Sequence, residues 1–575
     1  MIMKIFRKFA YRNLNYRRKM NKKKLLTICM FIVTAGALQA QSFETATQAV
    51  KNMGVGWNLG NTLDANNNNG SRQDLTSETC WGQPYTKPEL MKMMKEAGFG
   101  AIRVPVTWFP HMDTSNKVDA AWMKRVHEVV DYVLDNGMYC ILNVHHDTGD
   151  GNIHWLHAST KTYNTVKGKY EALWQQIAEE FKDYGEKLLF EAYNEMLDDD
   201  NCWNYPSWYS NKAYNATSAK DSYDAINKYA QSFVDVVRAT GGNNTKRNLV
   251  VNTYAAACGG EWGNGHPNET LTELVIPTDT KAGNGHIAVE VHTYPSVTNM
   301  TNAKNEVNTL FSRLKSKLTD AKGVPVIIGE WGTANSGETD YDVRHDNVIE
   351  FADYFVKKAK EYNCATFHWM GLTDGTNRSL PVFNQADLAE TIVKAYYGNT
   401  EGNKYPTRDD ITSEYEVTYN NQWSELNLIQ GTISTSTYKG LELELAEAPA
   451  AKAFQFKVYP SEKTQDITAA KSTLTFTSAM GTSISRITLQ SSQAGNKTTV
   501  KNVYLIKKDG TRQKTEVTPF WGCSVNEKVI TGIKPVTYTR STDHHIYNLS
   551  GQRVTNPVKG IYIQNGKKYF SKKRA

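Results

Sequence analysis

The sequence predicts an α/β protein: a (β/α)8 barrel of the TIM type, followed by an all-β sandwich and a short C-terminal tail. Three observations predict this fold. Apolar runs alternate with longer amphipathic stretches from Phe43 to Gly398. The composition then changes to short runs rich in Thr, Ser, Val and Tyr. At 575 residues, the chain is also too long for one ordinary domain.

The first forty residues predict a signal peptide. Lys22–Lys24 are basic, residues 25–37 are apolar, and "AGALQA" offers small side chains for cleavage after Ala40. Met20 is an alternative start, and a membrane anchor is the competing interpretation, although the apolar run is short for a bilayer. Residues 1–40 carry ten basic side chains and no acid, so the net charge of +7 becomes −3 without them. We therefore expect a secreted or cell-surface protein with no membrane span after signal removal and no nucleic-acid partner.

Eight apolar runs in residues 43–398 predict the strands of the barrel. In chain order they are 55–61, 101–106, 139–147, 188–195, 248–254, 287–295, 324–332 and 365–371. Such nearly continuous runs are typical of strands buried on both faces, as in a parallel sheet covered by helices. Eight of them favour a closed barrel.

The stretches between these runs predict helices. Residues 87–98 and 121–137 place apolar side chains three and four positions apart, and both end near a glycine. Residues 170–185 and 347–363 follow the same pattern. An open, doubly wound sheet is the alternative, but no glycine-rich phosphate loop follows the first strand.

The remaining chain divides into three parts by composition. Residues 399–411 are typical of a linker, and residues 412–527 contain short alternating runs at the spacing of a β-sandwich. Residues 530–575 form the predicted tail, a small β appendage on composition alone.

The cysteines give no sign of a metal site. Six follow the predicted signal, at positions 80, 140, 202, 258, 364 and 523, and none forms a C-x-x-C pair. One or two disulfides remain compatible with an exported protein. No metal and no cofactor is expected, because the sequence holds no H-E-x-x-H or dense acidic motif.

Polar and aromatic side chains occur where the predicted strands end. In a parallel barrel these ends meet on one rim, where reactive residues lie. One such residue is more often structural, but a whole set on one rim is hard to explain by packing. The set is Asn61, Arg103, His145, His146, Asn194, Glu195, His292, Tyr294, Glu330, Trp331 and Trp369.

Glu195 and Glu330 end the fourth and seventh strands, on opposite sides of the predicted mouth. Two carboxyl groups about 5 Å apart suit a retaining glycosidase, in which one group donates a proton and the other attacks the anomeric carbon. Arg103 is a suitable cation to keep the attacking carboxylate ionised. A structural Arg–Glu pair and a metal site are the competing interpretations.

Several motifs together resemble glycoside hydrolase family 5, the large cellulase family of clan A. They are "GWNLGNTLDA", "IRVPVTW", "NVHHD", "FEAYNEM", "HTYP", "GEWG" and "FHWMG", and they occur in the family's order over about residues 43–398. The resemblance implies a (β/α)8 barrel that cleaves β-1,4-glycosidic bonds with retention. Met196 stands where the family usually has proline after the "NE" pair.

The resemblance also implies a role for each residue at the rim. Glu195 is the implied acid/base and Glu330 the implied nucleophile. The supporting residues are Arg103 and Tyr294 on the nucleophile, His292 on the acid/base and Asn194 on the sugar 2-hydroxyl. The implied sugar-binding residues are Asn61, Asp64, His145, His146, Trp331 and Trp369.

Aromatic side chains extend the predicted substrate surface, because flat rings pack against the C–H faces of pyranoses. Trp57, Trp81, Trp108, Trp203, Tyr205, Trp208 and Tyr209 lie near strand ends or in loops, and about half of them are expected only to shield loops. The C-terminal module resembles the carbohydrate-binding β-sandwiches often attached to cellulases. Its candidate platform is Tyr415, Tyr419, Trp423, Phe520 and Trp521, with a core role as the alternative for each.

Within the family, "GWNLGNTLDA" with "ETCWGQP" looks most like the subgroup of endoglucanases, licheninases, xyloglucanases and some xylanases. We therefore expect a monomeric endo-β-1,4-glucanase acting on cellulose, mixed-linkage or xyloglucan-type β-glucans. A xylanase or mannanase of the same fold, and a non-catalytic glycan-binding protein, are the alternatives. The last residues resemble C-terminal segments of exported Bacteroidetes-type proteins, some of which are sorting signals.

Overall fold

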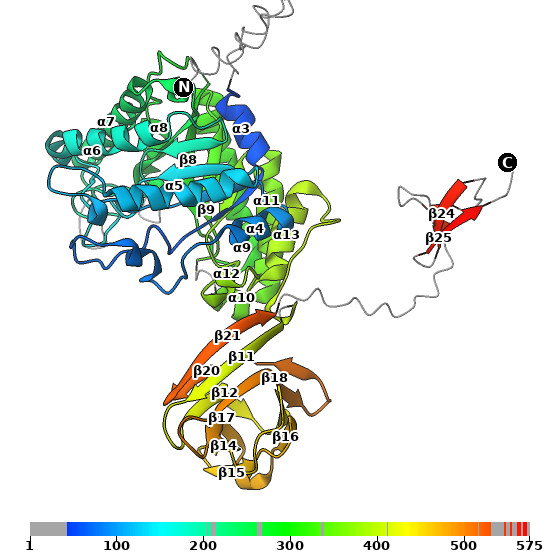
Figure 1. Ribbon diagram of the computed structural model, residues 1–575. Helices are drawn as coiled ribbons and strands as arrows, with labels where there is room; N and C mark the ends of the chain where they lie inside the picture. Colours follow the sequence, from blue (N-terminus) through cyan, green and yellow to red (C-terminus); the bar gives the residue numbers. More distant parts are fainter. Residues whose placement is uncertain are drawn as a thin grey trace, which may run out of the picture. The chain divides into compact units, whose positions relative to one another are not determined.

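The structure is a computed structural model that divides into two compact units, residues 1–405 and 406–575, each described here by itself (Figure 1). The predicted signal, residues 1–40, lies outside the described residues. These are 43–203, 205–208, 214–261, 267–283, 285–334, 338–410, 412–515, 517–530, 546–547, 553–554, 560–564 and 567–571.

The first unit is the predicted closed barrel of eight parallel strands. Their order around the barrel is β1 (Val55–Asn58), β10 (Ala365–His368), β9 (Val326–Trp331), β8 (Ile287–Thr293), β5 (Leu249–Asn252), β4 (Leu188–Glu191), β3 (Tyr139–Asn143) and β2 (Ala101–Val104). The hairpin of β6 (Gly260–Glu261) and β7 (Pro267–Asn268) stands apart from the barrel. All eight predicted strands are present, which confirms the fold class.

Most observed strands end two to four residues before the predicted runs do. Glu195, for example, lies four residues beyond the end of β4. The apolar runs continue past the ladder because the loops at the rim are themselves buried. The rim residues therefore sit on short loops that the barrel holds in place.

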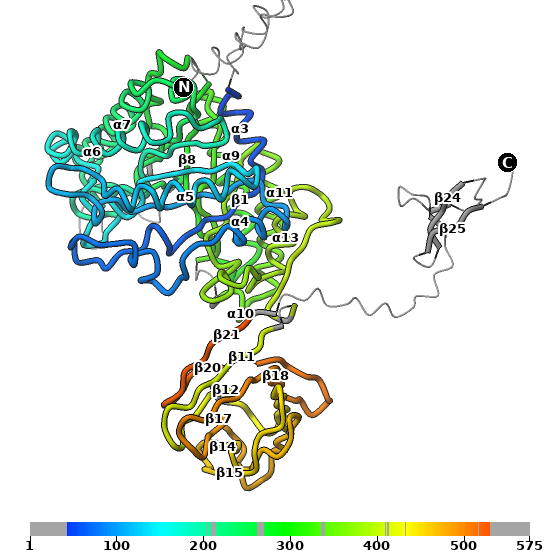
Figure 2. The backbone as a smooth tube through the Cα atoms, viewed as in Figure 1, coloured from blue at the N-terminus to red at the C-terminus, as the bar shows by residue number. Residues whose placement is uncertain are grey.

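Helices surround the barrel, as the tube in Figure 2 traces from blue to green. They are α4 (Pro88–Ala97), α5 (Ala120–Asp135), α6 (Thr160–Glu180), α7 (Ala216–Ala239), α8 (Thr270–Glu273), α9 (Met300–Leu314), α10 (Glu338–Val343), α11 (His345–Glu361), α12 (Thr376–Ser379) and α13 (Ala386–Tyr397). Their boundaries follow local signals: Asp119 caps α5 through the amides of Ala121 and Trp122, and Gly98 ends α4 at φ +102°. None of the helices in the described part of the chain is both long and apolar enough to cross a bilayer.

A short helix closes the barrel at the N-terminal ends of its strands. α3 (Ala46–Met53) begins with a capping box between Thr45 and Gln48. Its buried side chains join the inward-facing residues of the strands, such as Ile141 and Leu189. Glu44 fixes this segment, because its carboxylate accepts a hydrogen bond from the Tyr139 hydroxyl at 2.7 Å. The open end of the barrel is therefore the opposite rim.

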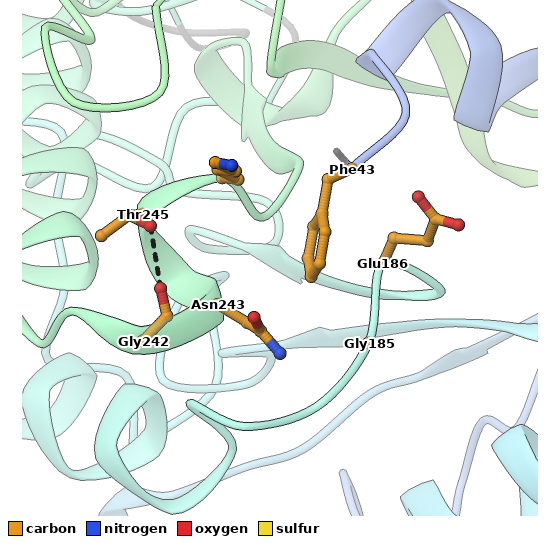
Figure 3. Close-up of a pocket in the computed structure, with 7 residues that line it drawn as sticks. Phe43, Gly185, Glu186, Gly242, Asn243 and Thr245 are labelled. Atoms are coloured by element: carbon orange, nitrogen blue, oxygen red, sulfur yellow. Dashed lines mark hydrogen bonds between the residues drawn. The ribbon is translucent and has the colours of Figure 1, made fainter. Parts of the chain in front are cut away.

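A pocket of about 350 Å³ lies at the closed end, lined by Phe43, Glu186, Asn243 and their neighbours (Figure 3). These residues precede β4 and β5 or lie next to α3. They are at the opposite end of the barrel from the residues predicted to be reactive. The substrate site is therefore to be sought at the other rim, not in this pocket.

The second unit is a sandwich of two antiparallel sheets. One has the order β16 (Lys471–Thr475), β13 (Tyr438–Leu445), β18 (Lys497–Lys507), β11 (Thr412–Tyr419) and β21 (Cys523–Ile530), with β19 (Arg512–Lys514) beside β18. The five-stranded sheet has the order β15 (Lys463–Asp466), β14 (Phe454–Tyr459), β17 (Ser483–Ser491), β12 (Glu425–Ser434) and β20 (Thr518–Trp521). Leucine, isoleucine, valine and aromatic side chains from both sheets fill the space between them.

Described residues of the predicted linker and of the tail also make defined contacts. Residues 403–405 of the predicted linker contact the barrel: the Lys404 amide donates to Glu96 O at 3.0 Å and the Tyr405 hydroxyl to Ala97 O at 2.8 Å. In the tail, β23 (Arg553–Val554), β22 (Ile546–Tyr547), β24 (Gly560–Gln564) and β25 (Lys567–Ser571) form a small antiparallel sheet. The six cysteines after the predicted signal are free thiols in the structure.

Candidate active site

A buried arginine surrounded by carboxylates forms the floor of the barrel mouth. Arg103, in β2, pairs with both oxygens of Glu191 through Nε at 2.7 Å and Nη2 at 2.8 Å. Its Nη1 donates to Glu330 Oε1 at 2.8 Å, and its Nε lies 3.1 Å from Glu290 Oε1. Burial lowers the pKa of Arg103, but the three carboxylates raise it well above its ordinary value. The guanidinium therefore stays charged and fixes the carboxylates around it.

Two of these carboxylates, Glu191 and Glu290, were not among the predicted site residues. Burial raises the pKa of Glu191, but Arg103 outweighs it and lowers the pKa below its ordinary value. Burial and the charge of Glu191 raise the pKa of Glu290 to about 7. The alternation of side chains along the strand could have predicted Glu290 as a site residue. Glu290 precedes His292 by two residues on the same strand and therefore shares its inward face.

Glu330 lies in β9 and is held by Arg103 of β2 and by His292 and Tyr294 at the end of β8. Its Oε1 accepts from Arg103, and its Oε2 accepts from the Tyr294 hydroxyl at 2.6 Å and lies 3.6 Å from His292 Nδ1. Burial raises the pKa of Glu330 above its ordinary value, while His292 and Arg103 act in the opposite direction. Burial likewise raises the pKa of Tyr294 well above its ordinary value, so its hydroxyl remains a donor.

A β-bulge aims Glu330 into the mouth. The register between β8 and β9 shifts at this point, where Val291 pairs with Ile328 but His292 pairs with Glu330. Strict alternation from Gly329 would have turned Glu330 toward the helices. Gly329 itself admits no side chain, because a Cβ there would overlap the carboxylate of Glu290. The glycine therefore makes room for the buried carboxylate beside the bulge.

Glu195 is more open to solvent than Glu330 and depends on His292. His292 Nδ1 lies 2.8 Å from Glu195 Oε1, and its Nε2 lies 3.2 Å from Glu290 Oε1. Burial lowers the pKa of His292, but Glu330, Glu195 and Glu290 raise it to about 10. At neutral pH the imidazolium therefore has a proton for each of these two carboxylates.

The two predicted catalytic carboxylates face each other across this group. One oxygen of Glu195 and one of Glu330 lie within 4.8 Å of each other and of a His292 nitrogen. The side chain of Glu195 is 21% exposed and that of Glu330 only 6%, so only Glu195 has open access to water. A separation of this size suits direct attack by one carboxylate, because it leaves no room for a water molecule between it and the sugar.

The comparisons with known proteins agree with this geometry. The model of the cellulase family, glycosyl hydrolase family 5, matches residues 63–372. The chain belongs to glycosyl hydrolase family 5. It is therefore a glycoside hydrolase, and the alternative of a non-catalytic binding protein is wrong.

Relatives of this family 5 hydrolase carry endoglucanase names. Endoglucanase A of Clostridium longisporum is 33% identical over 411 residues, which is 65% of this chain and 73% of the relative. Endoglucanase B of Neocallimastix patriciarum is 31% identical over 388 residues, covering 64% of this chain and 74% of the relative.

Solved structures give the same family. A GH5-4 broad-specificity endoglucanase from an uncultured bacterium is 56% identical with a TM-score of 0.60, covering 64% of this chain and 99% of that one. A family 5 enzyme of Prevotella bryantii B14, solved with a xyloglucan tetradecasaccharide, is 41% identical with a TM-score of 0.55, covering 62% of this chain and 99% of that one. Each of these two matches covers less than two thirds of this chain.

The other predicted residues of the hydrolase lie around the same mouth. Asn194 is buried and its Oδ1 accepts from Arg103 Nη2 at 2.7 Å, which leaves its amide nitrogen to donate elsewhere. Trp369 is partly exposed and its ring is parallel to that of His145, with centroids 5.8 Å apart. Burial holds the pKa of His145 well below its ordinary value, so this imidazole is neutral.

The edge of the mouth next to His145 is formed by Asn61, Asp64 and His146. Asp64 accepts from the amides of Asn61 and Thr62 at 3.1 and 2.8 Å, which fixes the turn after β1. His146 Nε2 lies 3.6 Å from Asp64 Oδ2. The ring of Trp81, which is 39% exposed, tilts against His146 with centroids 5.2 Å apart. Trp81 therefore extends the aromatic surface of the mouth.

Trp331 does not line the mouth, contrary to the prediction. The bulge that turns Glu330 inward turns Trp331 outward, where it is 1% exposed and stacks on Phe355 of α11 at 4.7 Å. A sugar ring cannot reach it, so its predicted substrate contact is wrong. Trp57 and Trp108 are also fully buried and belong to the core, as does Tyr205 at 2% exposure. Tyr209 lies outside the described residues.

Two groups of side chains in the described part of the chain have spacings that a metal ion could use: Asp64 with His145 and His146, and Glu195 with His292 and Glu330. In the second group, hydrogen bonds from Arg103, Tyr294 and His292 already occupy the carboxylates. The carboxylate oxygens of Glu195 and Glu330 are thus already engaged in hydrogen bonds. The expectation of no metal and no cofactor stays a prediction.

Proposed function

We propose that this family 5 hydrolase is a secreted, retaining endo-β-1,4-glucanase, with Glu330 as nucleophile and Glu195 as acid/base. The observation that carries the proposal is the pair of carboxylates within 4.8 Å, one held by Arg103 and Tyr294 and the other by His292. The endoglucanase names of the relatives support the substrate class.

In the first step Glu330 attacks the anomeric carbon while the glycosidic C–O bond breaks. Glu195 gives its proton to the departing oxygen, so the leaving sugar departs as a neutral alcohol. The new negative charge on Glu195 is met by the Nδ1–H of His292, 2.8 Å away. Arg103 and Tyr294, which held the charge on Glu330, relax their hydrogen bonds as the ester forms.

In the second step water enters on the side that the leaving sugar has vacated. Glu195, now a carboxylate, takes a proton from this water as its oxygen attacks the anomeric carbon. The ester bond to Glu330 breaks and its carboxylate returns to Arg103 and Tyr294. Two displacements at one carbon restore the β configuration, and Glu195 regains the proton for the next cycle.

An open mouth lined by Trp369 and Trp81 supports an endo mode of cleavage. Both rings are open to solvent in part, since Trp81 is 39% exposed and Trp369 is partly exposed, so a chain that lies across the mouth can pack against them. The GH5-4 relative is described as broad in specificity, and the Prevotella enzyme was solved with a xyloglucan oligosaccharide. We therefore propose mixed-linkage glucan, xyloglucan and cellulose as substrates.

Chemical rescue tests the two roles. We expect Glu330→Ala and Glu195→Ala each to lower the hydrolysis of an aryl β-cellobioside by at least about a thousandfold. With Glu330→Ala, added azide attacks in place of the nucleophile and gives the α-glycosyl azide. With Glu195→Ala, azide attacks the ester on Glu330 and gives the β-glycosyl azide. The opposite assignment of products would exchange the two roles, and undiminished turnover would refute the mechanism.

A panel of polymers tests the substrate class. Reducing-sugar release is to be measured on carboxymethylcellulose, barley β-glucan, xyloglucan, xylan and glucomannan. We expect activity on at least one of the glucans, and a rapid fall in viscosity relative to sugar released, as internal cleavage requires. Activity confined to xylan or mannan would overturn the glucanase assignment while leaving the carboxylate roles intact.

A further inference from the structure

The outward face of the five-stranded sheet in the second unit exposes a group of large aromatic side chains. Trp423, Phe520 and Trp521 are 47, 41 and 52% exposed. Within the described residues of this unit, they are the large apolar side chains that stand open to solvent. Two other predicted platform residues, Tyr415 and Tyr419, are buried in the sandwich core, so that part of the prediction is wrong. Exposed aromatic clusters mark interaction sites.

The backbone holds these aromatics next to one another at one end of the sheet. Trp521, in β20, is directly paired with Glu425 of β12. Ser424 Oγ donates to Gly522 O at 2.7 Å, which ties the turn that carries Trp423 to the end of β20. Trp423 itself adopts φ +65°, a left-handed conformation that bulky residues rarely take. The turn therefore accepts strain while presenting an indole to water.

A rigid polar layer lies beside the aromatics. Glu425 is 5% exposed and accepts hydrogen bonds from Tyr459, Thr488 and Gln490, all at 2.8 Å. Gln455 donates to Gln490 at 2.6 Å and continues the network across β14. These side chains alternate with Leu426, Ile487 and other core residues along their strands, so they face outward. The buried Glu425 and Gln490 thereby hold the half-buried Tyr459 and Gln455 in fixed positions before any ligand arrives.

Two cationic side chains complete the face. The Arg486 guanidinium lies 3.7 Å over the ring of Phe520, and its Nε has no hydrogen-bond partner among the described residues. Tyr459 meets the same ring edge-on, with centroids 6.4 Å apart. Lys457 lies 3.6 Å from Glu425. Arg486 and Tyr459 thus hold Phe520 in one orientation.

We propose that this face, formed by Trp423, Phe520, Trp521, Tyr459 and Arg486, is a second glycan site that binds a β-linked glucan chain. Pyranose rings present C–H groups on their faces and hydroxyls at their edges, which matches flat rings beside fixed polar groups. The charge also fits a neutral polymer, because Arg486 and Lys457 are accompanied by Glu425. The choice of glucan rests on the proposed activity of the barrel; the choice of a carbohydrate rests on the face itself.

Affinity electrophoresis of the full-length protein tests the proposal. Native gels containing barley β-glucan, xyloglucan or no polymer give a Kd from the retardation of the band. We expect Trp423→Ala and Trp521→Ala each to weaken retardation about tenfold, as for other aromatic residues at the centre of a binding site. Tyr504→Ala is the matched control, because Tyr504 is a half-buried aromatic on the outer face of the other sheet. It should leave retardation unchanged.

Hydrolysis separates this site from the active site. Turnover of a soluble cello-oligosaccharide should be the same in the Trp423 and Trp521 variants as in the unaltered protein, while Trp369→Ala should lower it. Trp-dependent retardation without hydrolysis of any glucan would refute the proposed activity but not this site. Equal retardation in the double variant Trp423→Ala/Trp521→Ala and the unaltered protein, or an equal loss in Tyr504→Ala, would overturn the site.

Discussion

The barrel mouth and the outer face of the five-stranded sheet both contain buried carboxylates, but they neutralise them differently. At the mouth, Glu191, Glu290 and Glu330 share one guanidinium and one imidazolium. On the sheet, Glu425 is satisfied mainly by two hydroxyls and an amide. Charges coupled at close range exchange protons when one of them changes, whereas neutral donors only hold a shape. The first arrangement suits bond cleavage, and the second suits binding.

Removing Arg103, the cation that the buried carboxylates share, should cause the largest loss of stability and activity. It should do so at the barrel mouth and leave the sandwich unaffected. We expect Arg103→Met to destabilise the barrel by about 3–5 kcal/mol, because three buried carboxylates lose their partner. Hydrolysis should be lost as well, since Glu330 is no longer held ionised. Thermal unfolding followed by calorimetry and activity on β-glucan measure both. Arg486→Met, in the sandwich, is the control and should leave the hydrolysis of a soluble cello-oligosaccharide unchanged.

Removing Glu425, the acceptor of the hydrogen-bond network on the sheet, should cause a smaller loss of stability that is confined to the second unit. We expect Glu425→Ala to lower the free energy of unfolding of the second unit by about 1–3 kcal/mol, because the buried Thr488 and Gln490 and the half-buried Tyr459 lose their acceptor. Turnover of a soluble oligosaccharide should not change, and calorimetry of the full chain would detect the early loss of the sandwich. A changed kcat would contradict the independence of the two regions.

A change in pH dependence, not in stability, should follow from Glu290→Gln. Glu290 helps to raise the pKa of His292 to about 10, so its removal lowers that pKa. His292 then loses its proton at lower pH, and we expect the titration of its imidazole, followed by NMR, to move down by about one pH unit. The acidic limb of kcat/KM, set by protonation of Glu330, should remain above the ordinary glutamate value. Glu425→Gln should change neither.

The sequence predicted the barrel because each strand is a continuous apolar run. It also predicted that Glu195 and Glu330 lie at one mouth, because both end such runs. It failed at Trp331, since alternation gives no warning of the bulge that exchanges the directions of Glu330 and Trp331. It also missed Glu290, because the pairing of its carboxylate with Arg103 of β2 exists only once the barrel has formed. In the sandwich, the spacing predicted strands but could not separate Tyr419, in the core, from Trp423, on the turn.

The closed end of the barrel has a practical consequence. Glu44 and α3 fasten the start of the described chain there, and Lys404 and Tyr405 fasten the exit from the barrel to the C-terminal end of α4. Helices run opposite to the strands in such a barrel, so both attachment points lie away from the mouth. A solid support coupled through residues near Phe43 would therefore leave the cleft facing the solution. Immobilised enzyme prepared in this way should keep its rate on soluble polymers.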